Sequence, residues 1–277
     1  NVPCRIHKNR NMNVSEKIAI IGGGNIGMSI AQGLVASHVY EPQQIIITRN
    51  TSDLPKDLHE NGFSFTDDNK KAVASSRIVF IAVLPQLAHA ILRDIAPSIT
   101  SNHVIISIVT GVFISEISEI ISQDICIARA MPNTAIKIRE SMTCIASNKK
   151  DCQDFEDIIS LFNALGKTLV IDEPLITSAT ALGSCGIAFF LRAIRAASQG
   201  GTQIGFHAED AQLIAAQTAK GAAELLLQLH THPEDEIDKV TTPHGVTIAG
   251  LNEMEHNGFS SAFIKGIVES YLKATKK

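Results

Sequence analysis

Short continuous apolar runs alternate with helical patterns along the chain up to about residue 172. The runs are rich in isoleucine and valine, a composition typical of strands that a parallel sheet buries on both faces. Strands are expected at 18–21, 44–48, 63–66, 77–83, 104–108, 125–131, 142–147 and 167–171. Helical patterns lie between them, at 28–37, at 67–75, from Leu84 onward and at 151–165. Strand–helix units joined by short connections predict an α/β fold with a doubly wound parallel sheet.

Strand signals end at Glu173 and Pro174, and the rest of the chain predicts helices alone. The helices are expected at 178–198, 208–230, 246–257 and 260–276, with breaks at Gly200-Gly201 and His232-Pro233. Roughly 100 residues of mostly apolar helix make a small core, so we expect a second subunit to complete it.

This change of pattern predicts two domains, a sheet domain at 14–173 and an all-helical domain for substrate binding and dimerisation at 174–277. Residues 1–13 are expected to form a disordered extension, within which Met12 is a candidate natural start. The extension is polar and basic without an apolar centre, so it does not have the pattern of a secretory signal.

Composition narrows the possible partners and the compartment. The chain has 277 residues, 45% of them apolar, and a formal net charge of −4 without a long basic run, which disfavours nucleic acid and anionic membrane surfaces. Apolar runs break within about ten residues, short of the roughly 20 that span a bilayer, so no membrane span is expected. The five cysteines are widely spaced and form no metal-ligand pattern. We therefore expect no metal site and a reducing, cytoplasmic location.

The most informative short stretch is the turn that follows the first strand. Gly22, Gly24 and Gly27 fit the spacing G-x-G-x-x-G between a strand and a helix that begins near Asn25. The first glycine allows the turn, the second lets a pyrophosphate approach the backbone, and the third lets helix and strand pack closely. Glycine turns also occur for purely structural reasons. Here strand, turn and helix agree, and the stretch predicts a Rossmann-type dinucleotide site with phosphates at the helix N-terminus.

The end of the second strand favours one nucleotide over the other. NAD-binding proteins usually carry an acid there, which accepts a hydrogen bond from the ribose 2′-hydroxyl. This chain has Arg49 instead, followed by Asn50, Thr51 and Ser52. An arginine can neutralise a 2′-phosphate, so we expect NADPH as the cofactor, with NADH as the alternative. The competing interpretation is that Arg49 is a solvated turn residue.

Two further groups of residues are expected to face a ligand. Thr110-Gly111 and the segment 131–134 follow predicted strands, so they should line the crevice at the carboxyl edge of the sheet. In the helical domain, two threonines, a proline and a glycine at 241–245 precede a helix that opens near Thr247. Such a loop can hold a small anion such as a carboxylate. A helix N-cap that serves stability alone explains the same residues equally well.

Several motifs extend over positions 17–271 in a fixed order. They are the glycine turn, Ala82-Val83 with Pro85-Gln86, Met131-Pro132-Asn133-Thr134, Ala181-Leu182 with Gly186 and Ala188, Gln217-Thr218 with Gly221-Ala222-Ala223, His232-Pro233 and the loop before Thr247. In this order and spacing the chain resembles the pyrroline-5-carboxylate reductases.

The resemblance implies a reductase that passes hydride from NAD(P)H to the C=N bond of 1-pyrroline-5-carboxylate and yields L-proline, the last step of proline biosynthesis. It implies a homodimer through the helical domain, or a larger ring of dimers. The nucleotide contacts that follow are Ile21, Gly22, Gly24, Asn25, Ile26, Gly27, Arg49, Asn69, Ala82, Val83, Leu84 and Pro85. The substrate contacts that follow are Thr242, Pro243, His244, Gly245, Val246 and Thr247. Among these, Thr247 would bond the ring nitrogen as the catalytic residue. We expect it to position and polarise the imine, because a hydroxyl is a poor general acid at neutral pH.

The chain departs from the family pattern at a few positions, and these leave the exact imine open. They are Leu84 in place of a lysine, Ala135 in place of a proline, Cys185, Ile187 and Phe189 at the start of the helical domain, and His244 and Val246 in the substrate turn. The imidazole of His244 is either a pH-dependent carboxylate ligand or a loop residue without a role.

Three other functions compete with this one. A β-hydroxyacid dehydrogenase shares the architecture but needs a catalytic lysine after the nucleotide domain, and no lysine occurs between Lys167 and Lys220. A reductase of another cyclic imine, such as a six-membered ring, fits the same residues. The third is a non-catalytic paralogue that binds NADP and senses redox state.

Overall fold

The computed structural model describes residues 16–49 and 62–276 of the chain. The predicted extension at 1–13 and the segment Asn50-Thr51-Ser52 lie outside this part. The chain divides into two compact units, and each is described by itself. One unit runs up to Ser184 and also holds the end of the chain from Tyr271, and the other runs from Cys185 to Ser270.

The first unit is built on one eight-stranded sheet. Its strands are β1 (Ile18–Ile21), β2 (Ile45–Thr48), β3 (Ser64–Thr66), β4 (Ile78–Ile81), β5 (Val104–Ser107), β6 (Cys126–Met131), β7 (Ser141–Ser147) and β8 (Gly166–Val170). They lie in the order β3-β2-β1-β4-β5-β6-β7-β8, with Ile18 of β1 opposite Ile45 of β2 and Ile78 of β4. The predicted α/β class with a doubly wound sheet is confirmed.

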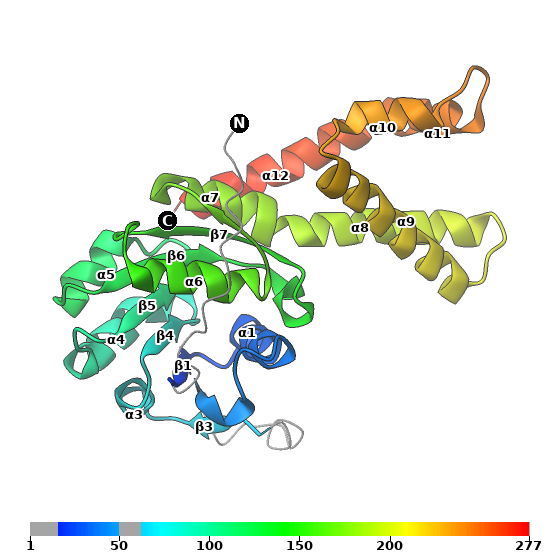
Figure 1. The fold of residues 1–277 in the computed structure, drawn as a ribbon. Coiled ribbons are helices and arrows are strands. Elements are labelled where there is room, and N and C mark those ends of the chain that lie inside the picture. The colour runs from blue at the N-terminus through cyan, green and yellow to red at the C-terminus, as the bar shows by residue number, and fades with distance from the viewer. Residues whose placement is uncertain (1–15, 50–61, 277) are drawn as a thin grey trace. The chain divides into compact units, whose positions relative to one another are not determined.

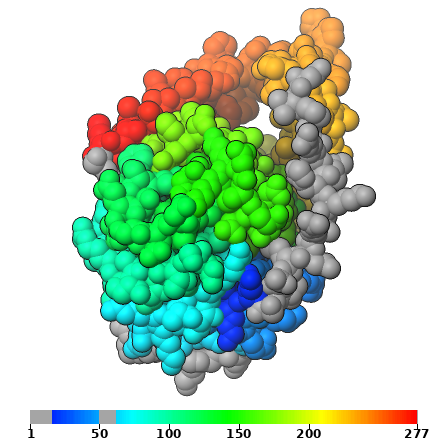
Figure 2. Space-filling model, turned by 60° about the vertical axis from the view of Figure 1, so that its left-hand side comes forward, coloured from blue at the N-terminus to red at the C-terminus, as the bar shows by residue number. Residues whose placement is uncertain are grey.

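Helices cover both faces of this sheet, which is why its central strands are apolar without alternation. The helices of this unit are α1 (Asn25–Ala36), α3 (Asn69–Ala74), α4 (Pro85–Ile95), α5 (Ile114–Ile121), α6 (Gln153–Asn163) and α7 (Ile176–Ala179). On one face Ile18 and Ile20 pack with α1 and α6, and on the other Ala19 and Ile21 pack with α3, α4 and α5 (Figure 1). In the space-filling view, the segments coloured cyan to green form one closely packed body (Figure 2).

The last two strands run against the first six. β6 pairs with β7 in antiparallel fashion, and β8 then follows β7 in parallel. The connection from Met131 to Ser141 holds only the short helix η4 (Thr134–Ile138), which ends at Arg139 with φ of +64°. A parallel return needs a crossover of a dozen or more residues, so this short connection can only turn the chain back. The sheet is therefore mixed at this edge, and our prediction of a parallel sheet is wrong for the pairing of β6 with β7.

The second unit consists of helices alone among its described residues. They are α8 (Gly186–Gln203), α9 (Ala208–Leu229), α10 (Pro233–Val240), α11 (Val246–His256) and α12 (Phe259–Thr275), of which the last few residues belong with the first unit. α8 packs along α9. α12 packs on α8 through Phe263, whose ring centroid lies 5.3 Å from that of Phe190.

The break predicted at Gly200-Gly201 is wrong, because both glycines lie inside α8. A Cβ on Gly201 would lie 3.1 Å from the Cβ of Ala211 in α9, so the glycine lets the two helices approach closely. Glycine costs about 1 kcal/mol in a helix interior, which packing offsets. The helix ends near Gly205 instead, where φ is +114°.

The break predicted at His232-Pro233 is confirmed, but the helix that follows it was missed. α9 ends at His230 with φ of +55°, and Pro233 is the first residue of α10. α10 is short and mostly charged, so it carries no apolar periodicity. Its acidic residues at 234–236 complement the helix dipole, and the His232 ring accepts a hydrogen bond from the Glu234 N–H at 3.3 Å.

Most apolar side chains of the helical unit are exposed in the single chain. No residue of α10, α11 or α12 is fully buried, and Leu191, Leu213 and Ile264 are 57%, 69% and 61% exposed. By length and composition alone, the stretch Glu173–Gln203 is long and apolar enough to cross a membrane, and 22% of its most apolar part is buried. This finding rests on length and composition alone, so it leaves our expectation of no membrane span untested. Core helices of water-soluble proteins pass the same test.

Candidate functional site

The turn after β1 has the backbone geometry that its glycine spacing predicts. Gly22 has φ of +108°, and a Cβ there would lie 2.5 Å from the Ala82 carbonyl oxygen. A Cβ on Gly27 would clash with the Gly22 carbonyl oxygen, so α1 packs directly on the turn. Gly24 differs, because nothing lies within 4 Å of a Cβ built on it. The backbone at Gly24 is open to a ligand, whereas the protein itself excludes side chains at the other two positions.

The first turn of α1 offers backbone N–H groups to an anion. Gly24 is its N-cap, no side chain caps the helix, and no acidic residue lies in the first turn. Asn25 is exposed and Ile26 half-buried, so both main-chain groups are within reach of a ligand. The Ile21 side chain is fully buried in the core, which leaves only its main chain near the turn. Such a helix start suits a diphosphate.

Arg49 lies directly after β2 and reaches back to the glycine turn. Its guanidinium Nη1 donates to the Gly23 carbonyl at 3.2 Å, and its main-chain N–H donates to the Thr66 carbonyl at 3.0 Å. β2 is fastened to the same turn, because the Gly23 N–H donates to the Thr48 carbonyl at 2.8 Å. A guanidinium is therefore held at the carboxyl end of β2, beside the turn.

The end of β4 borders the same turn. The Ala82 N–H donates to the Ile21 carbonyl at 2.8 Å, and a Cβ on Gly22 would lie 2.9 Å from a methyl group of Val83. Leu84 is the N-cap of α4 with a side chain that is 60% exposed, and Pro85 is the first helical residue.

Asn69 is the first residue of α3, which follows β3 directly. It is half-buried, and the preceding Asp68 caps the helix by accepting the Lys71 N–H at 3.0 Å. The residues predicted to hold a nucleotide thus lie at or just after the carboxyl ends of β1, β2, β3 and β4. In an open α/β sheet, ligands bind at this edge.

The segment after β6 is tied to the start of the helical region. The Asn133 N–H donates to Ser141 Oγ, and its side-chain Nδ2 donates to the Gly183 carbonyl, both at 3.1 Å. Gly183 lies in a short π-helical turn, η6 (Thr180–Ser184). Asn133 is 9% exposed, so its side chain has a structural role at this edge. Thr110-Gly111, the other predicted crevice residues, follow β5, and Gly111 has φ of +77°.

The predicted substrate residues form one tight turn between α10 and α11. The Gly245 N–H donates to the Thr242 carbonyl at 2.9 Å, with Pro243 and His244 as the central residues. His244 has φ of +59°, the left-handed conformation that favours glycine and that histidine tolerates better than most residues. A Cβ on Gly245 would lie 2.7 Å from Thr242 Oγ1, so glycine is required there.

Val246 and Thr247 are the first residues of α11, and Gly245 is its N-cap. No side chain caps this helix, and no acid lies in its first turn. Val246 is 91% exposed, and Thr247 is exposed as well. A free helix start with a hydroxyl beside it can bind a carboxylate. These residues lie in the second unit, and the nucleotide residues lie in the first.

One buried charge escaped the sequence reasoning. Arg129 is 2% exposed within β6, its Nη1 donates to Glu173 at 3.1 Å, and its guanidinium lies 5.0 Å from the Phe113 ring centroid. Glu173 also accepts the Ile114 N–H at 2.7 Å, so the pair ties β6 to the start of α5. Arg129 Nε is buried without a partner. The sequence did contain a signal for this residue, because Arg129 is a charged residue within the apolar run 125–131.

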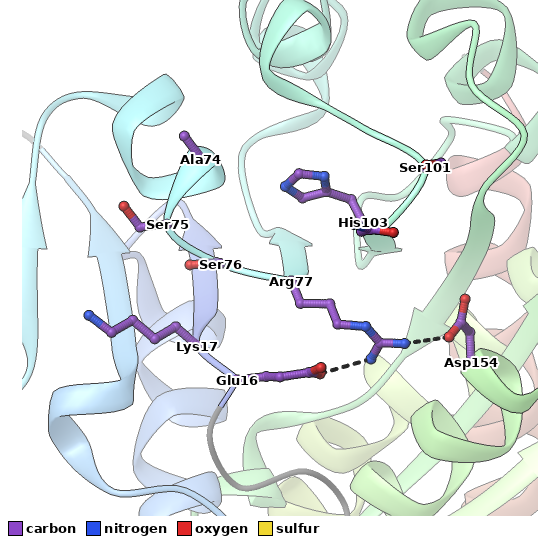
Figure 3. A pocket seen from close by; sticks show the side chains of 10 residues that line it. Glu16, Lys17, Ala74, Ser75, Ser76, Arg77, Ser101, His103 and Asp154 are labelled. Carbon is purple, nitrogen blue, oxygen red and sulfur yellow. Dashed lines mark hydrogen bonds and ion pairs between the residues drawn. The ribbon is translucent and has the colours of Figure 1, made fainter.

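A polar cleft of about 740 Å³ opens at the other edge of the sheet (Figure 3). It is lined by Glu16, Lys17, Ala74, Ser75, Ser76, Arg77, Ser101, Asn102, His103 and Asp154. Arg77 donates to Glu16 at 3.0 Å and to Asp154 at 2.5 Å, so both acids neutralise it. The lining residues precede β1, β4 and β5, except for Asp154 in α6, whereas the glycine turn follows β1. The cleft is therefore separate from the candidate site.

No group of three or more side chains that could hold a metal ion occurs in the part of the chain that the structure describes. Among the described residues, the glycine turn with Arg49 offers N–H groups and a guanidinium, and the turn before α11 offers N–H groups and hydroxyls. These groups bind phosphates and carboxylates.

Two family models match the chain. One is described as pyrroline-5-carboxylate reductase dimerisation and matches residues 173–277. The other is described as NADP oxidoreductase, coenzyme F420-dependent, and matches residues 17–111.

Two similar curated proteins come from Dictyostelium discoideum. Its pyrroline-5-carboxylate reductase 2 is 50% identical over 279 residues, which cover 95% of this chain and 93% of that protein. Its pyrroline-5-carboxylate reductase 1 is 51% identical over 269 residues, 93% of this chain, but the chain spans only 49% of that protein's length.

A solved structure is similar over nearly its whole length. The pyrroline carboxylate reductase of Plasmodium falciparum, with NADP bound, matches with a TM-score of 0.85 and 24% identity, over 94% of this chain and 97% of that one. At this identity the likeness supports the fold alone.

Proposed function

This chain belongs to the pyrroline-5-carboxylate reductase family, and from that premise we propose that it reduces 1-pyrroline-5-carboxylate to L-proline with hydride from NADPH. The observation that carries the proposal is the 50% identity to a reductase over 93% of that protein's length. The reaction saturates a C=N bond and completes proline biosynthesis.

We assign NADPH to the glycine turn of the first unit. The open backbone at Gly24 and the uncapped start of α1 fit a diphosphate. Arg49 fits a 2′-phosphate, since it lies at the strand end where an acid would select NADH. The match of 17–111 to a family described as NADP oxidoreductases supports the same choice. Bound NADPH supplies the hydride.

We assign the substrate to the turn before α11. The N–H groups at the start of α11 would hold the ring carboxylate, with Thr242, Pro243, His244, Gly245 and Val246 shaping the turn. The Thr247 hydroxyl would bond the ring nitrogen and so hold the imine in position. Most of the acceleration should then come from placement of the imine carbon against the nicotinamide.

We further propose that the helical domain forms a homodimer. Residues 173–277 match a dimerisation family, and the large apolar side chains of this unit are exposed in the single chain. A second copy would bury them, and this also accounts for the apolar surface of Glu173–Gln203. Several such dimers could in turn assemble into a ring, which is the larger assembly that the proposal allows. The four described cysteines are free, which supports a reducing location such as the cytoplasm.

The decisive experiment is a steady-state assay of NADPH oxidation with pyrroline-5-carboxylate, using the wild type and Thr247→Ala. We expect the wild type to turn over and the variant to lose well over tenfold in kcat. NADPH affinity should stay near the wild-type value, because Thr247 lies outside the nucleotide residues. Thr247→Ser keeps the hydroxyl and is the matched control, for which we expect substantial activity.

Each of the other possible outcomes of this assay would favour one alternative to the proposed function. Turnover with a six-membered cyclic imine but not with pyrroline-5-carboxylate would reassign the substrate. NADPH binding without turnover of either imine would favour the redox-sensing paralogue. Unchanged kcat in Thr247→Ala would remove the assigned role of this residue.

A further inference from the structure

The polar cleft at the amino edge of the sheet takes no part in the proposed reaction (Figure 3). Its volume of about 740 Å³ accommodates a small molecule, and Ala74 is the only apolar residue among the described residues that line it. An apolar ligand would cover these polar groups without pairing them, which costs free energy. The cleft therefore suits a ligand that carries polar groups along its whole length.

Four charged side chains line the cleft, two of each sign. Arg77 Nη1 donates to Glu16 Oε2 at 3.0 Å, and Arg77 Nη2 donates to Asp154 Oδ1 at 2.5 Å. Each of these carboxylates has a second oxygen that is without a partner in the described part of the chain. The fourth charge is Lys17, which is exposed and forms no ion pair with any described residue. One ammonium group and two carboxylate oxygens thus remain available to a ligand.

His103, which also lines the cleft, adds no charge to this set. Its ring is buried, Nδ1 accepts the Thr100 N–H at 2.9 Å, and Nε2 donates to the Val73 carbonyl at 3.2 Å, so the ring is neutral. The charges of the lining therefore cancel. A free phosphate would meet the two acids, and a simple amine would meet the two cations, so neither is attracted strongly. A ligand without net charge is favoured.

The available charges lie on different sides of Arg77. In Figure 3 the Lys17 side chain extends to the side of Ser75 and Ser76, whereas the Glu16 carboxylate points the other way, to Arg77. Ser76 Oγ is enclosed without a hydrogen-bond partner among the described residues, a condition that is rare in native proteins. Rotation about χ1 would turn this hydroxyl into the cleft, where it would donate to an acceptor on the ligand. The Lys17 side of the cleft thus suits an anionic group.

We propose that the cleft binds a short free peptide of two or three residues. The peptide carboxylate pairs with Lys17 and the Ser76 hydroxyl, and the terminal ammonium pairs with the free oxygens of Glu16 and Asp154. A single amino acid has its two charges on one carbon atom, whereas each further residue separates them by about 3.3–3.6 Å. The peptide amides match the hydroxyl and amide side chains of the lining. The proposal does not depend on the reductase activity, since the cleft lies at the opposite edge of the sheet from the glycine turn.

The test is isothermal titration calorimetry of the full chain with triglycine, which has both terminal charges and no side chains. We expect one site per chain with a Kd of about 1 mM or lower. N-acetyl-triglycine lacks the ammonium and triglycine amide lacks the carboxylate, so each should bind about tenfold more weakly or worse. Glycine is too short to reach both sides and should bind as weakly as these two.

Two variants connect each end of the peptide with its partner. Lys17→Met should weaken triglycine binding about 10- to 100-fold and leave binding of the triglycine amide nearly unchanged, because the amide has no carboxylate. Glu16→Gln should weaken triglycine binding and leave binding of N-acetyl-triglycine nearly unchanged, because the acetylated peptide has no ammonium. Lys71→Met, at an exposed lysine of α3 outside the cleft, is the matched control and should bind triglycine as the wild type does. A melting temperature near the wild-type value shows that each variant is folded.

Three results would overturn the proposal. One is the absence of saturable triglycine binding by the wild type. Another is a site that depends on Lys17 but binds inorganic phosphate or glycine as tightly as triglycine, since the cleft would then hold a simple anion or a single amino acid. The third is triglycine binding that Thr247→Ala removes and Lys17→Met retains, because the peptide would then occupy the turn before α11.

Discussion

Arg49 has two partners in the structure, and together they hold its guanidinium beside the glycine turn. Its main-chain N–H bonds the Thr66 carbonyl, and its Nη1 bonds the Gly23 carbonyl. A guanidinium has five N–H donors in a planar fork, so one bond to the turn leaves capacity for a phosphate. At this scale we propose that this one side chain selects NADPH over NADH.

Arg49→Gln should raise the Kd for NADPH about 10- to 100-fold, because a charge-assisted contact contributes about 1.5–3 kcal/mol. The Kd for NADH should change little, since NADH has no 2′-phosphate. Fluorescence titration of both nucleotides measures the two constants. Arg93→Gln, at an exposed arginine of α4, is the control and should leave both unchanged. An equal loss for NADPH and NADH would mean that Arg49 only holds the turn.

At the scale of the element, the start of α1 contains two glycines with different surroundings, Gly24 and Gly27. Gly27 is excluded from carrying a side chain by the Gly22 carbonyl, whereas Gly24 has space around it and an ordinary φ of −79°. Gly27 therefore serves packing, and we propose that the open backbone at Gly24 receives the diphosphate that approaches the helix start.

These two glycines allow a paired prediction. Gly27→Ala should lower the free energy of unfolding by about 1–3 kcal/mol, because the methyl group overpacks the contact between helix and strand. Gly24→Ala should leave that free energy within about 0.5 kcal/mol and weaken NADPH binding at least tenfold, since its methyl group would meet the diphosphate. Urea unfolding and NADPH titration of both variants measure the two effects. Intact NADPH binding in Gly24→Ala would remove the diphosphate from this turn.

Two helices of the second unit show where a prediction from the local sequence pattern fails. Gly200-Gly201 looked like a break, but Gly201 lies against Ala211 of α9, and that contact stabilises the continuous helix. α10 was missed since its charged residues give no apolar period, and its stability comes from capping and the helix dipole instead.

At the scale of the whole molecule, the helical unit leaves apolar surface that one chain does not cover. Leu191 of α8, Leu213 of α9 and Ile264 of α12 are each more than half exposed. Each fully buried leucine contributes about 1.5–3 kcal/mol, so a second copy that covers these side chains would stabilise a dimer strongly.

Leu191→Glu should shift the protein from dimer toward monomer, because a buried carboxylate without a partner is unfavourable. Sedimentation velocity at micromolar concentration measures the change. Leu87→Glu, at a 48% exposed leucine of α4, is the control and should remain dimeric. A wild type that sediments as a single chain, or that floats with lipid vesicles, would contradict the dimer proposal.

The sequence by itself determined the order of strands and helices in the first unit, the glycine turn at Gly22–Gly27 and the proline–glycine turn before α11. All of these depend on residues within a few positions of one another, so local periodicity and turn chemistry suffice. The family followed from several such motifs in one order, each of which is short and local.

Only the tertiary structure decided what depends on residues distant in sequence. It set the direction of β7 and β8, because an apolar strand has the same pattern in parallel and antiparallel pairs. It also paired Arg129 with Glu173. No spacing along the chain encodes such contacts, since they arise when strands and helices pack.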